Sequence, residues 1–250
     1  MNLLKNAFYL IYKLYYFTVF TLLFLALYPF LLIGIFLLKN NYFIYFLHRV
    51  WAFLLNLLTF ISLEVRRENQ VLPNQPLIII ANHTSFLDVF LMTKIVPNHP
   101  FVFMAKAELL KIPLFRTLFK FYHIPVFRKS RKKAAQAIVL SKVKLRSGLS
   151  VVIFPEGGII DGLAPKMAHF KNGAFELAKD QKVAILPITY LNNFKLLESR
   201  DKFLSVSRPG KAYAVVHPLI SVDEVMKLSV QELKQKCYDT INQPLVERWQ

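Results

Sequence analysis

The N-terminal part of the sequence contains a long segment without a charged residue. Tyr15–Leu38 is a run of 24 consecutive positions that lack Asp, Glu, Lys and Arg. Since a helix needs about 20 apolar residues to cross the hydrocarbon core of a bilayer, this segment is long enough to span one. It is too long for the core of a signal peptide, and no small-residue cleavage site follows it. Pro29, near its middle, predicts a kink or a break in the helix.

A second apolar segment, Tyr42–Ile61, contains His48, Arg49 and a tryptophan. These residues favour a helix at the membrane interface, or one inserted obliquely, over a simple span. The sequence therefore predicts that residues 1–61 attach the chain to a membrane, and it leaves the number of spans open. Basic residues after the first segment outnumber those before it, which favours a cytoplasmic location for the rest of the chain.

The overall composition restricts the class of partner. The chain is 55% hydrophobic, yet 32 basic residues against 15 acidic ones give it a net charge of +17. Such a chain suits an anionic membrane surface; nucleic acid would explain the charge but not the apolar content, so we expect anionic lipids as partners and no nucleic acid. The single cysteine, Cys237, excludes an intramolecular disulfide and has no zinc-type spacing, so no metal is expected.

From residue 62 onward, short apolar runs alternate with helical stretches. The predicted strands are Leu63–Arg67, Pro76–Ala81, Phe101–Ala105, Ile124–Phe127, Leu149–Phe154, Val183–Leu191 and Ala212–His217. The predicted helices are Phe86–Ile95, Glu108–Phe121, Lys129–Ser147, Asn172–Lys179 and Val222–Trp249. This alternation predicts an α/β domain over residues 62–250, with a mixed, largely parallel sheet flanked by helices, after an N-terminal hydrophobic helical anchor over residues 1–61.

The stretch IIIANHTSFLDVF, residues 78–90, allows two interpretations. Ser85 and Asp88 match the [ST]-x-x-[DE] capping box that begins a helix. Alternatively, Asp88 orients His83, and the second ring nitrogen of the histidine acts as a general base. Five residues along one helix would turn the two side chains to different faces. They meet only if the chain bends between them, and a helix cap makes it bend, so the two interpretations are compatible.

Several downstream stretches add candidate ligands. Glu156 and Gly157 lie in FPEGG, after an apolar strand, where free backbone amides suit phosphate or hydroxyl groups, although a plain strand-to-helix turn has the same appearance. Arg128 follows another predicted strand, and its guanidinium is suited to clamp a phosphate. Lys171 lies at a helix start, and Pro187 inside an apolar strand predicts a bulge or a sheet edge.

Taken in order, NHTSFLD, HIPVFR, FPEGG and ILPI resemble the four sequence blocks of the glycerolipid acyltransferase family, and most closely those of its bacterial lysophosphatidate acyltransferases. The resemblance extends from about residue 62 to residue 217, and AKAEL and FKNGAF add to it. It implies a membrane-bound O-acyltransferase of phospholipid biosynthesis, which moves a fatty acyl group from a thioester to the free hydroxyl of lysophosphatidate and gives phosphatidic acid. It further implies that the protein is located in a bacterial inner membrane, with the catalytic domain on the cytoplasmic face.

The resemblance also assigns roles to residues. His83 would be the general base and Asp88 the residue that orients it. Substrate binding would fall to Asn82, Ser85, Lys106, Arg128, Glu156, Gly157 and Lys171. The reaction would need no cofactor, with acyl-CoA or acyl carrier protein supplying the acyl group as co-substrate.

Two departures from the family pattern leave the acceptor open. Tyr122 stands where the second block has glycine, and Gly158, Ile159 and Ile160 stand where the third has Thr-Arg-Ser. The missing arginine removes one phosphate ligand, so another lysophospholipid or a lyso-aminolipid remains an alternative acceptor. A non-catalytic basic membrane module is a further alternative, while the lack of a G-x-S-x-G motif counts against a hydrolase.

Overall fold

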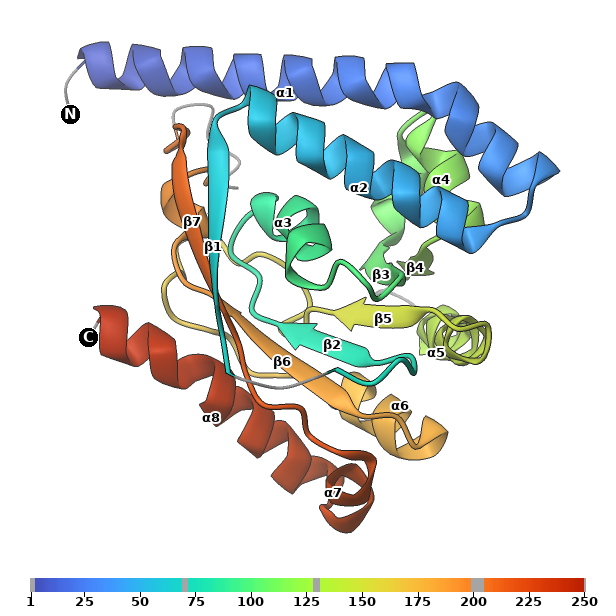
Figure 1. Ribbon diagram of the computed structural model, residues 1–250. Coiled ribbons are helices and arrows are strands. Elements are labelled where there is room, and N and C mark those ends of the chain that lie inside the picture. The colour runs from blue at the N-terminus through green and yellow to red at the C-terminus, as the bar shows by residue number, and fades with distance from the viewer. Residues whose placement is uncertain (1–2, 69–71, 128–130, 199–204, 250) are drawn as a thin grey trace.

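The computed structural model describes residues 3–68, 72–127, 131–198 and 205–249 of the chain. They form one seven-stranded sheet in the order β1-β7-β6-β2-β5-β3-β4, with helices on both faces (Figure 1). The strands are β1 (Ile61–Arg67), β2 (Ile78–Ala81), β3 (Phe101–Lys106), β4 (Ile124–Val126), β5 (Ser150–Ile153), β6 (Ile185–Tyr190) and β7 (Gly210–Val216). Neighbouring strands are parallel except β6 and β7, so the predicted mixed, largely parallel sheet is confirmed.

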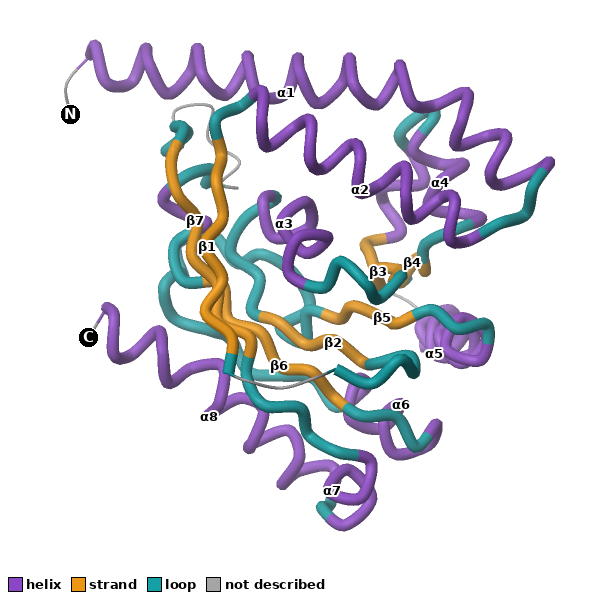
Figure 2. The backbone as a smooth tube through the Cα atoms, in the orientation of Figure 1, coloured by secondary structure: helices purple, strands orange, loops and turns teal. Residues whose placement is uncertain are grey.

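From β2 to β6 the helices alternate with the strands along the chain (Figure 2). They are α1 (Leu3–Leu32), α2 (Asn41–Leu58), α3 (Leu87–Ile95), α4 (Phe115–Phe121), α5 (Arg131–Arg146), α6 (Gly173–Gln181), α7 (Val222–Lys227) and α8 (Val230–Trp249), with a π-helical turn at Ile33–Leu37 and short 3₁₀ turns at Ala107–Lys111 and Asn193–Lys195. Helices α1, α2 and α3 lie on one side of the sheet, and α6, α7 and α8 on the other (Figure 1).

Two predicted helices are each divided in the structure. The stretch predicted as Glu108–Phe121 is interrupted at Pro113, which disfavours helical dihedrals in the residue before it, and Leu114 has a positive φ of 67°. The last predicted helix ends at Lys227, and α8 then begins with a capping box. In that box Ser229 N donates to Glu232 Oε2 at 2.8 Å, while Glu232 N donates to Ser229 Oγ at 3.3 Å.

The interpretation of Pro187 as a mark of a sheet edge is wrong, because β6 lies in the interior of the sheet between β7 and β2. Pro187 is tolerated there because the ladder to β7 begins one residue later, at Ile188. Its carbonyl oxygen still accepts a hydrogen bond from His217 N at 3.1 Å. The N–H that proline lacks therefore lies outside the antiparallel β6–β7 ladder, one residue before its first pair.

The N-terminal helices pack against the rest of the protein. The sequence predicts a kink or a break at Pro29. Helix α1 continues through Pro29 to Leu32 without a break, and it bends toward its C-terminal end (Figure 1). The Phe20 ring lies 4.9 Å from that of Trp51 in α2, and the Phe24 ring lies 4.4 Å from that of Phe115 in α4. The division between residues 61 and 62 into an anchor and a catalytic domain stays a prediction, and the two parts share one hydrophobic core.

Four adjacent strands, β6, β2, β5 and β3, run in the same direction. Their C-terminal ends therefore meet at one edge of the sheet, and open α/β sheets bind their ligands outside this edge. We call it the catalytic edge. The loop after β2 brings NHTSFLD to this edge, the loop after β5 brings FPEGG, and β3 ends there at Lys106.

Candidate active site

His83 and Asp88 meet at the catalytic edge. His83 lies in the loop after β2 and Asp88 in the first turn of α3, and His83 Nδ1 is 2.9 Å from Asp88 Oδ2. The chain bends between them because Ser85 begins the helix turn: its Oγ accepts a hydrogen bond from Leu87 N at 3.1 Å. The helix cap and the His–Asp pair thus coexist, as the sequence suggested. The bond through Nδ1 leaves Nε2 of His83 as the atom available to a substrate proton.

The carboxylate of Asp88 is fully buried and its oxygens are occupied by donors. Oδ2 also accepts hydrogen bonds from Thr84 N at 2.8 Å and Ser85 N at 2.9 Å. Oδ1 accepts one from Asn193 Nδ2 at 2.6 Å. Because a buried carboxylate must be satisfied by donors, these bonds fix its position, and through it the orientation of the His83 ring.

An aromatic ring also packs against one face of the His83 imidazole. Phe154, the first residue after β5, stacks on His83 with ring centroids 3.9 Å apart and an interplanar angle of 13°. The side chain of His83 is 15% exposed. The ring is therefore clamped in plane by Asp88 and from one face by Phe154, while part of it stays accessible.

Asn82 and Ser85 are both fully buried and already bonded to the protein. Asn82 pairs with the backbone of Tyr190 in β6, accepting from its N at 2.7 Å and donating to its O at 2.9 Å. Ser85 Oγ donates to Leu197 O at 2.6 Å. These contacts tie the histidine loop to the chain that follows β6. Substrate contact by either side chain stays a prediction.

Glu156 connects the histidine loop to the loop after β5. Its Oε1 accepts a hydrogen bond from His83 N at 2.8 Å, and its Oε2 accepts one from Ala168 N at 2.8 Å. Burial raises the pKa of Glu156 to about 7, and the nearby charge of Asp88 adds to this, while the two backbone hydrogen bonds lower the pKa. Both carboxylate oxygens bind backbone N–H groups. Glu156 therefore positions the histidine loop, and contact with a substrate stays a prediction.

The raised pKa of Glu156 predicts a pH-dependent stability. The folded protein binds this proton more tightly than the unfolded chain, so the stabilisation is complete below the ordinary pKa of 4.5 and is lost as the pH rises through about 7. Glu156→Gln has no such proton to lose. Between pH 4.5 and pH 8, the free energy of unfolding of the wild type should therefore fall relative to that of the variant, by on the order of 3 kcal/mol.

Denaturant unfolding in detergent micelles over this pH range measures the difference. The matched control is Glu64→Gln, which removes an exposed carboxylate on β1. Curves for the wild type and Glu156→Gln that stay parallel across the whole range would contradict the raised pKa.

Gly157 and Lys171, two further predicted ligands, come together. Gly157 has a φ of +87°, and a Cβ placed on it would lie 2.6 Å from Lys171 Nζ. The backbone of the same segment is held by Lys171 N, which donates to Pro155 O at 2.9 Å. Glycine is thus favoured by its positive φ, while the flexible side chain of Lys171 could move away from a Cβ at this position. Lys171 is exposed, so its ammonium lies at the surface of the catalytic edge.

Lys106 and Arg128 were predicted on the neighbouring strands. Lys106 is exposed at the C-terminal end of β3, which is separated from β2 by β5. Arg128 lies outside the described residues. Among the residues that the structure describes, no three His, Cys, Asp or Glu side chains come together as a metal site.

Three residues of the site have no local sequence signal. Asn193 is 105 positions downstream of Asp88, and Tyr190 OH donates to Asp88 O at 2.6 Å across 102 positions. Phe154 is the first residue of FPEGG, but nothing in this block indicates that its ring stacks on His83. Only the order of the strands, in which β2 lies between β6 and β5, brings them to the histidine.

Several known proteins resemble this chain. It is 32% identical over 174 residues to a 1-acyl-sn-glycerol-3-phosphate acyltransferase from Chlamydomonas reinhardtii, which covers 69% of this chain and 51% of that protein. It is 34% identical over 176 residues to a protein of the same name from Borreliella burgdorferi, covering 68% and 65%. This chain therefore spans about half the length of the first of these relatives.

A solved structure shares the fold. The crystal structure of the 1-acyl-sn-glycerophosphate (LPA) acyltransferase PlsC from Thermotoga maritima matches with a TM-score of 0.76. The match covers 98% of this chain and 97% of that one, at 21% sequence identity. The arrangement of sheet and helices, including the N-terminal helices, is thus shared.

The sequence model of a family described as Acyltransferase matches residues 62–191. This range is just over half of the chain, and it includes the histidine loop, the loop after β5 and strand β6. The resemblance read from the four sequence blocks is confirmed, and the chain belongs to the acyltransferase family.

Proposed function

We propose that this protein transfers a fatty acyl group from an acyl thioester to the free hydroxyl of lysophosphatidate, giving phosphatidic acid. The observation that carries the proposal is the His83–Asp88 pair, 2.9 Å apart at the catalytic edge and fixed by further hydrogen bonds. The names of the Chlamydomonas and Borreliella relatives, both 1-acyl-sn-glycerol-3-phosphate acyltransferases, support the choice of acceptor.

The proposed reaction is a direct transfer. Nε2 of His83 removes the proton of the acceptor hydroxyl while its oxygen bonds to the thioester carbonyl carbon. The resulting tetrahedral oxyanion collapses, the carbon–sulfur bond breaks, and the imidazolium returns its proton to the leaving thiolate. The negative charge of Asp88 stabilises the imidazolium between these two steps. Lys106 and Lys171, exposed on neighbouring segments of the catalytic edge, are the proposed donors to the oxyanion or the acceptor phosphate.

The activity is tested with the full chain in lipid vesicles, supplied with lysophosphatidate and either acyl-CoA or acyl carrier protein loaded with a fatty acid. The expected product is phosphatidic acid, detected by mass. A wild type that acylates only phosphate-free lyso-lipids would contradict the acceptor but keep the chemistry. No transfer to any lyso-lipid would favour the non-catalytic membrane module.

The alternative acceptor rests on one specific feature of the loop after β5. Ile159 stands where the family pattern has an arginine, so one phosphate ligand is replaced by an apolar side chain. A panel that contains lysophosphatidate, a neutral lysophospholipid and a lyso-aminolipid separates the acceptors. The highest kcat/KM for lysophosphatidate is the expected result.

We propose further that α1 and α2 attach the protein to an anionic membrane, as the inner-membrane location with a cytoplasmic catalytic domain requires. By length and composition, Leu3–Leu37 is apolar enough to cross a membrane. Large hydrophobic side chains of both helices are exposed, among them Leu3, Leu4, Phe8, Ile11, Leu14, Leu22, Leu25, Phe30, Phe46, Phe53, Leu57 and Leu58. So many exposed apolar side chains on two adjacent helices are typical of a membrane or protein interface.

Charges placed on this surface should weaken membrane binding. Leu22 and Leu25 are 61% and 47% exposed on the same side of α1. Their joint replacement by lysine should lower co-flotation with phosphatidylglycerol vesicles at least about 10-fold, since each leucine loses roughly 1.5–3 kcal/mol of burial in lipid. The control is Met226→Lys, at an exposed apolar position on α7. Unchanged flotation of the double variant would contradict attachment through this surface of α1.

A further inference from the structure

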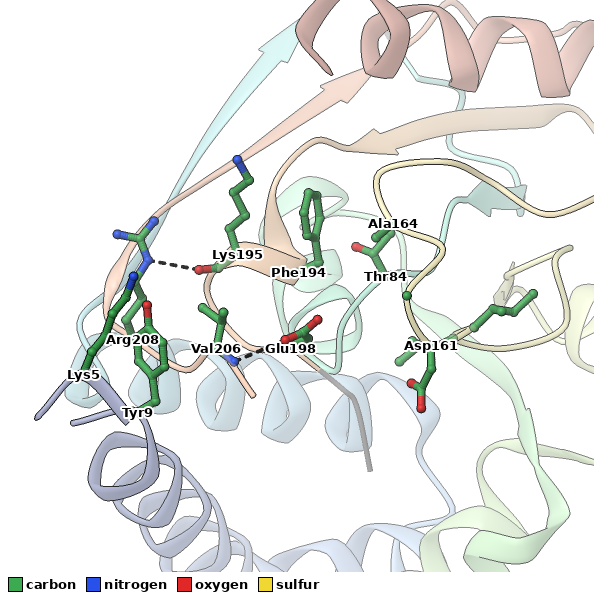
Figure 3. A pocket seen from close by; sticks show the side chains of 13 residues that line it. Lys5, Tyr9, Thr84, Asp161, Ala164, Phe194, Lys195, Glu198, Val206 and Arg208 are labelled. Atoms are coloured by element: carbon green, nitrogen blue, oxygen red, sulfur yellow. Dashed lines mark hydrogen bonds between the residues drawn. The ribbon is translucent and has the colours of Figure 1, made fainter. Parts of the chain in front are cut away.

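A cavity of about 550 Å³ reaches the histidine loop at Thr84, the residue after His83. Its walls come from four segments that are distant in the sequence: the start of α1, the histidine loop, the loop after β5, and the chain between β6 and β7 (Figure 3). Thr84, the neighbour of His83, lines the cavity at one end. Lys5 and Arg208 line it at the opposite end (Figure 3).

The hydroxyl of Thr84 points to a ligand. The side chain is 8% exposed, and within the part of the chain that the structure describes its Oγ1 has no hydrogen-bond partner. A buried hydroxyl without a partner destabilises a protein unless something else satisfies it. A substrate group that enters this end of the cavity would lie against Thr84, the residue next to the proposed base, and a rotation of this side chain would turn its buried hydroxyl toward the group.

The far end of the cavity carries the positive charge. Arg208 Nε donates to Lys195 O at 3.0 Å, which fixes the guanidinium at the wall near Lys5. The ammonium of Lys195 is engaged elsewhere, 3.7 Å from the ring centroid of Trp249. A guanidinium and an ammonium that line the same end of one cavity form a suitable site for a phosphate group.

We propose that this cavity binds the phosphopantetheine arm of the acyl donor, with the arm's phosphate between Lys5 and Arg208 and its thioester next to Thr84. The inference rests on the proposed function, and it gives the acyl donor of that reaction a binding site in this cavity. In lysophosphatidate only a few bonds separate the phosphate from the reacting hydroxyl. A phosphate at the far end would therefore hold that hydroxyl away from His83. In a phosphopantetheine arm many more bonds separate the phosphate from the thioester, so the two groups can occupy opposite ends of one cavity.

The remaining wall residues agree with this ligand. Glu198 lines the cavity between its ends and Asp161 lines it at the Thr84 end (Figure 3). Carboxylates accept hydrogen bonds from the two amide N–H groups and the hydroxyl of pantetheine. Tyr9 and Ile159 supply apolar surface for its methyl and methylene groups. Since Ile159 replaces the arginine of the family pattern, the cations of this cavity lie at its far end rather than beside the base.

The test compares donors with and without the phosphate. The double variant Lys5→Gln/Arg208→Gln should raise KM at least about 10-fold for acyl-CoA, or for the loaded carrier protein if the wild type uses that donor, since charged hydrogen bonds to the phosphate are lost. It should leave unchanged the KM for acyl-pantetheine, which has no phosphate, and the KM for the lyso-lipid. A rise for acyl-pantetheine or for the lyso-lipid instead would overturn the proposal.

The control removes two positive charges from the opposite side of the molecule. Lys182→Gln/Lys227→Gln, at exposed positions after α6 and at the end of α7, should leave every KM unchanged. This variant separates a specific phosphate site from general attraction of an anionic donor by the basic protein. If it raises the donor KM as much as Lys5→Gln/Arg208→Gln does, the cavity is not the site.

Thr84→Val tests the inner end of the cavity. Valine keeps the shape and removes a hydroxyl that has no partner among the described residues, so Tm should stay equal or rise. The rate constant kcat should fall about 10-fold, as expected for one lost hydrogen bond to the reacting group. An unchanged kcat would overturn the assignment of the thioester to this end.

A binding measurement keeps this inference separate from the proposed reaction. Calorimetry with coenzyme A alone should show binding to the wild type in detergent micelles, and at least about 10-fold weaker binding to Lys5→Gln/Arg208→Gln. Equal affinities would overturn the cavity even if acyl transfer is found. Normal binding together with no transfer to any lyso-lipid would overturn the reaction and leave the cavity assigned.

Discussion

His83→Ala should lower kcat for acyl transfer by roughly 10³-fold, the usual effect of removing a general base. The structure gives three reasons. His83 lies at the edge where parallel strands end, its Nδ1 is bonded to a fully buried carboxylate at 2.9 Å, and its ring is clamped by Phe154. Without the imidazole, no other described histidine has this arrangement at the catalytic edge.

The loss should occur with the fold intact. The side chain of His83 is partly exposed, so its truncation should change Tm by only a few degrees. The control is His99→Ala, which removes a histidine just before β3, at the opposite edge of the sheet, and should keep full activity. Full transferase activity in a folded His83→Ala protein would show that the proposed base is wrong.

Asp88→Asn should reduce both activity and stability. The carboxylate accepts hydrogen bonds from His83, from two backbone amides and from Asn193. The amide of asparagine has an NH₂ group in place of one carboxylate oxygen. This NH₂ group would face hydrogen-bond donors, and those buried donors would lose their acceptor. We expect the free energy of unfolding to fall by about 3–5 kcal/mol and kcat to fall on the order of 10²–10³-fold, since the imidazolium is no longer stabilised.

The matched control is Asp180→Asn, in which a surface carboxylate paired with Lys142 at 2.9 Å is removed. Exposed pairs contribute about 0–1 kcal/mol, so this variant should resemble the wild type in both measurements. Asn193→Ala gives an intermediate case, because it removes one of the four donors and leaves the charge. A wild-type kcat in folded Asp88→Asn would show that Asp88 only builds the helix cap.

The pattern of apolar and turn residues was sufficient to predict the sheet. All seven strands lie close to their predicted positions, because each is a short apolar run bounded by turn residues. The errors came from single residues whose effect depends on neighbours. Pro187 lies in a central strand because the ladder to β7 begins one residue later. Ser229 did carry a local signal, a capping box that divides the last helix, and it was missed.

The candidate site was predicted only where its residues are close in the sequence. His83, Ser85 and Asp88 lie within six positions, so a helix cap and a His–Asp pair could be read from one stretch. Asn193, Tyr190 and Phe154 could not, because their contacts with this stretch depend on the strand order β6-β2-β5. Likewise, no local pattern connects Lys5 with Arg208, which are more than two hundred positions apart and share one cavity.

The sequence by itself predicted the apolar N-terminal helices, the α/β alternation and the chemical identity of the proposed base and its carboxylate partner. These follow from local periodicity and from side-chain chemistry at short spacing, which do not need the fold to be known. The tertiary structure decided how that pair is held and what surrounds it. Four hydrogen bonds to Asp88, the Phe154 stack and the cavity that ends at Thr84 all require strands from distant parts of the chain to end at one edge. The free energy that fixes this edge comes from burial of the shared core, which no short stretch of sequence contains.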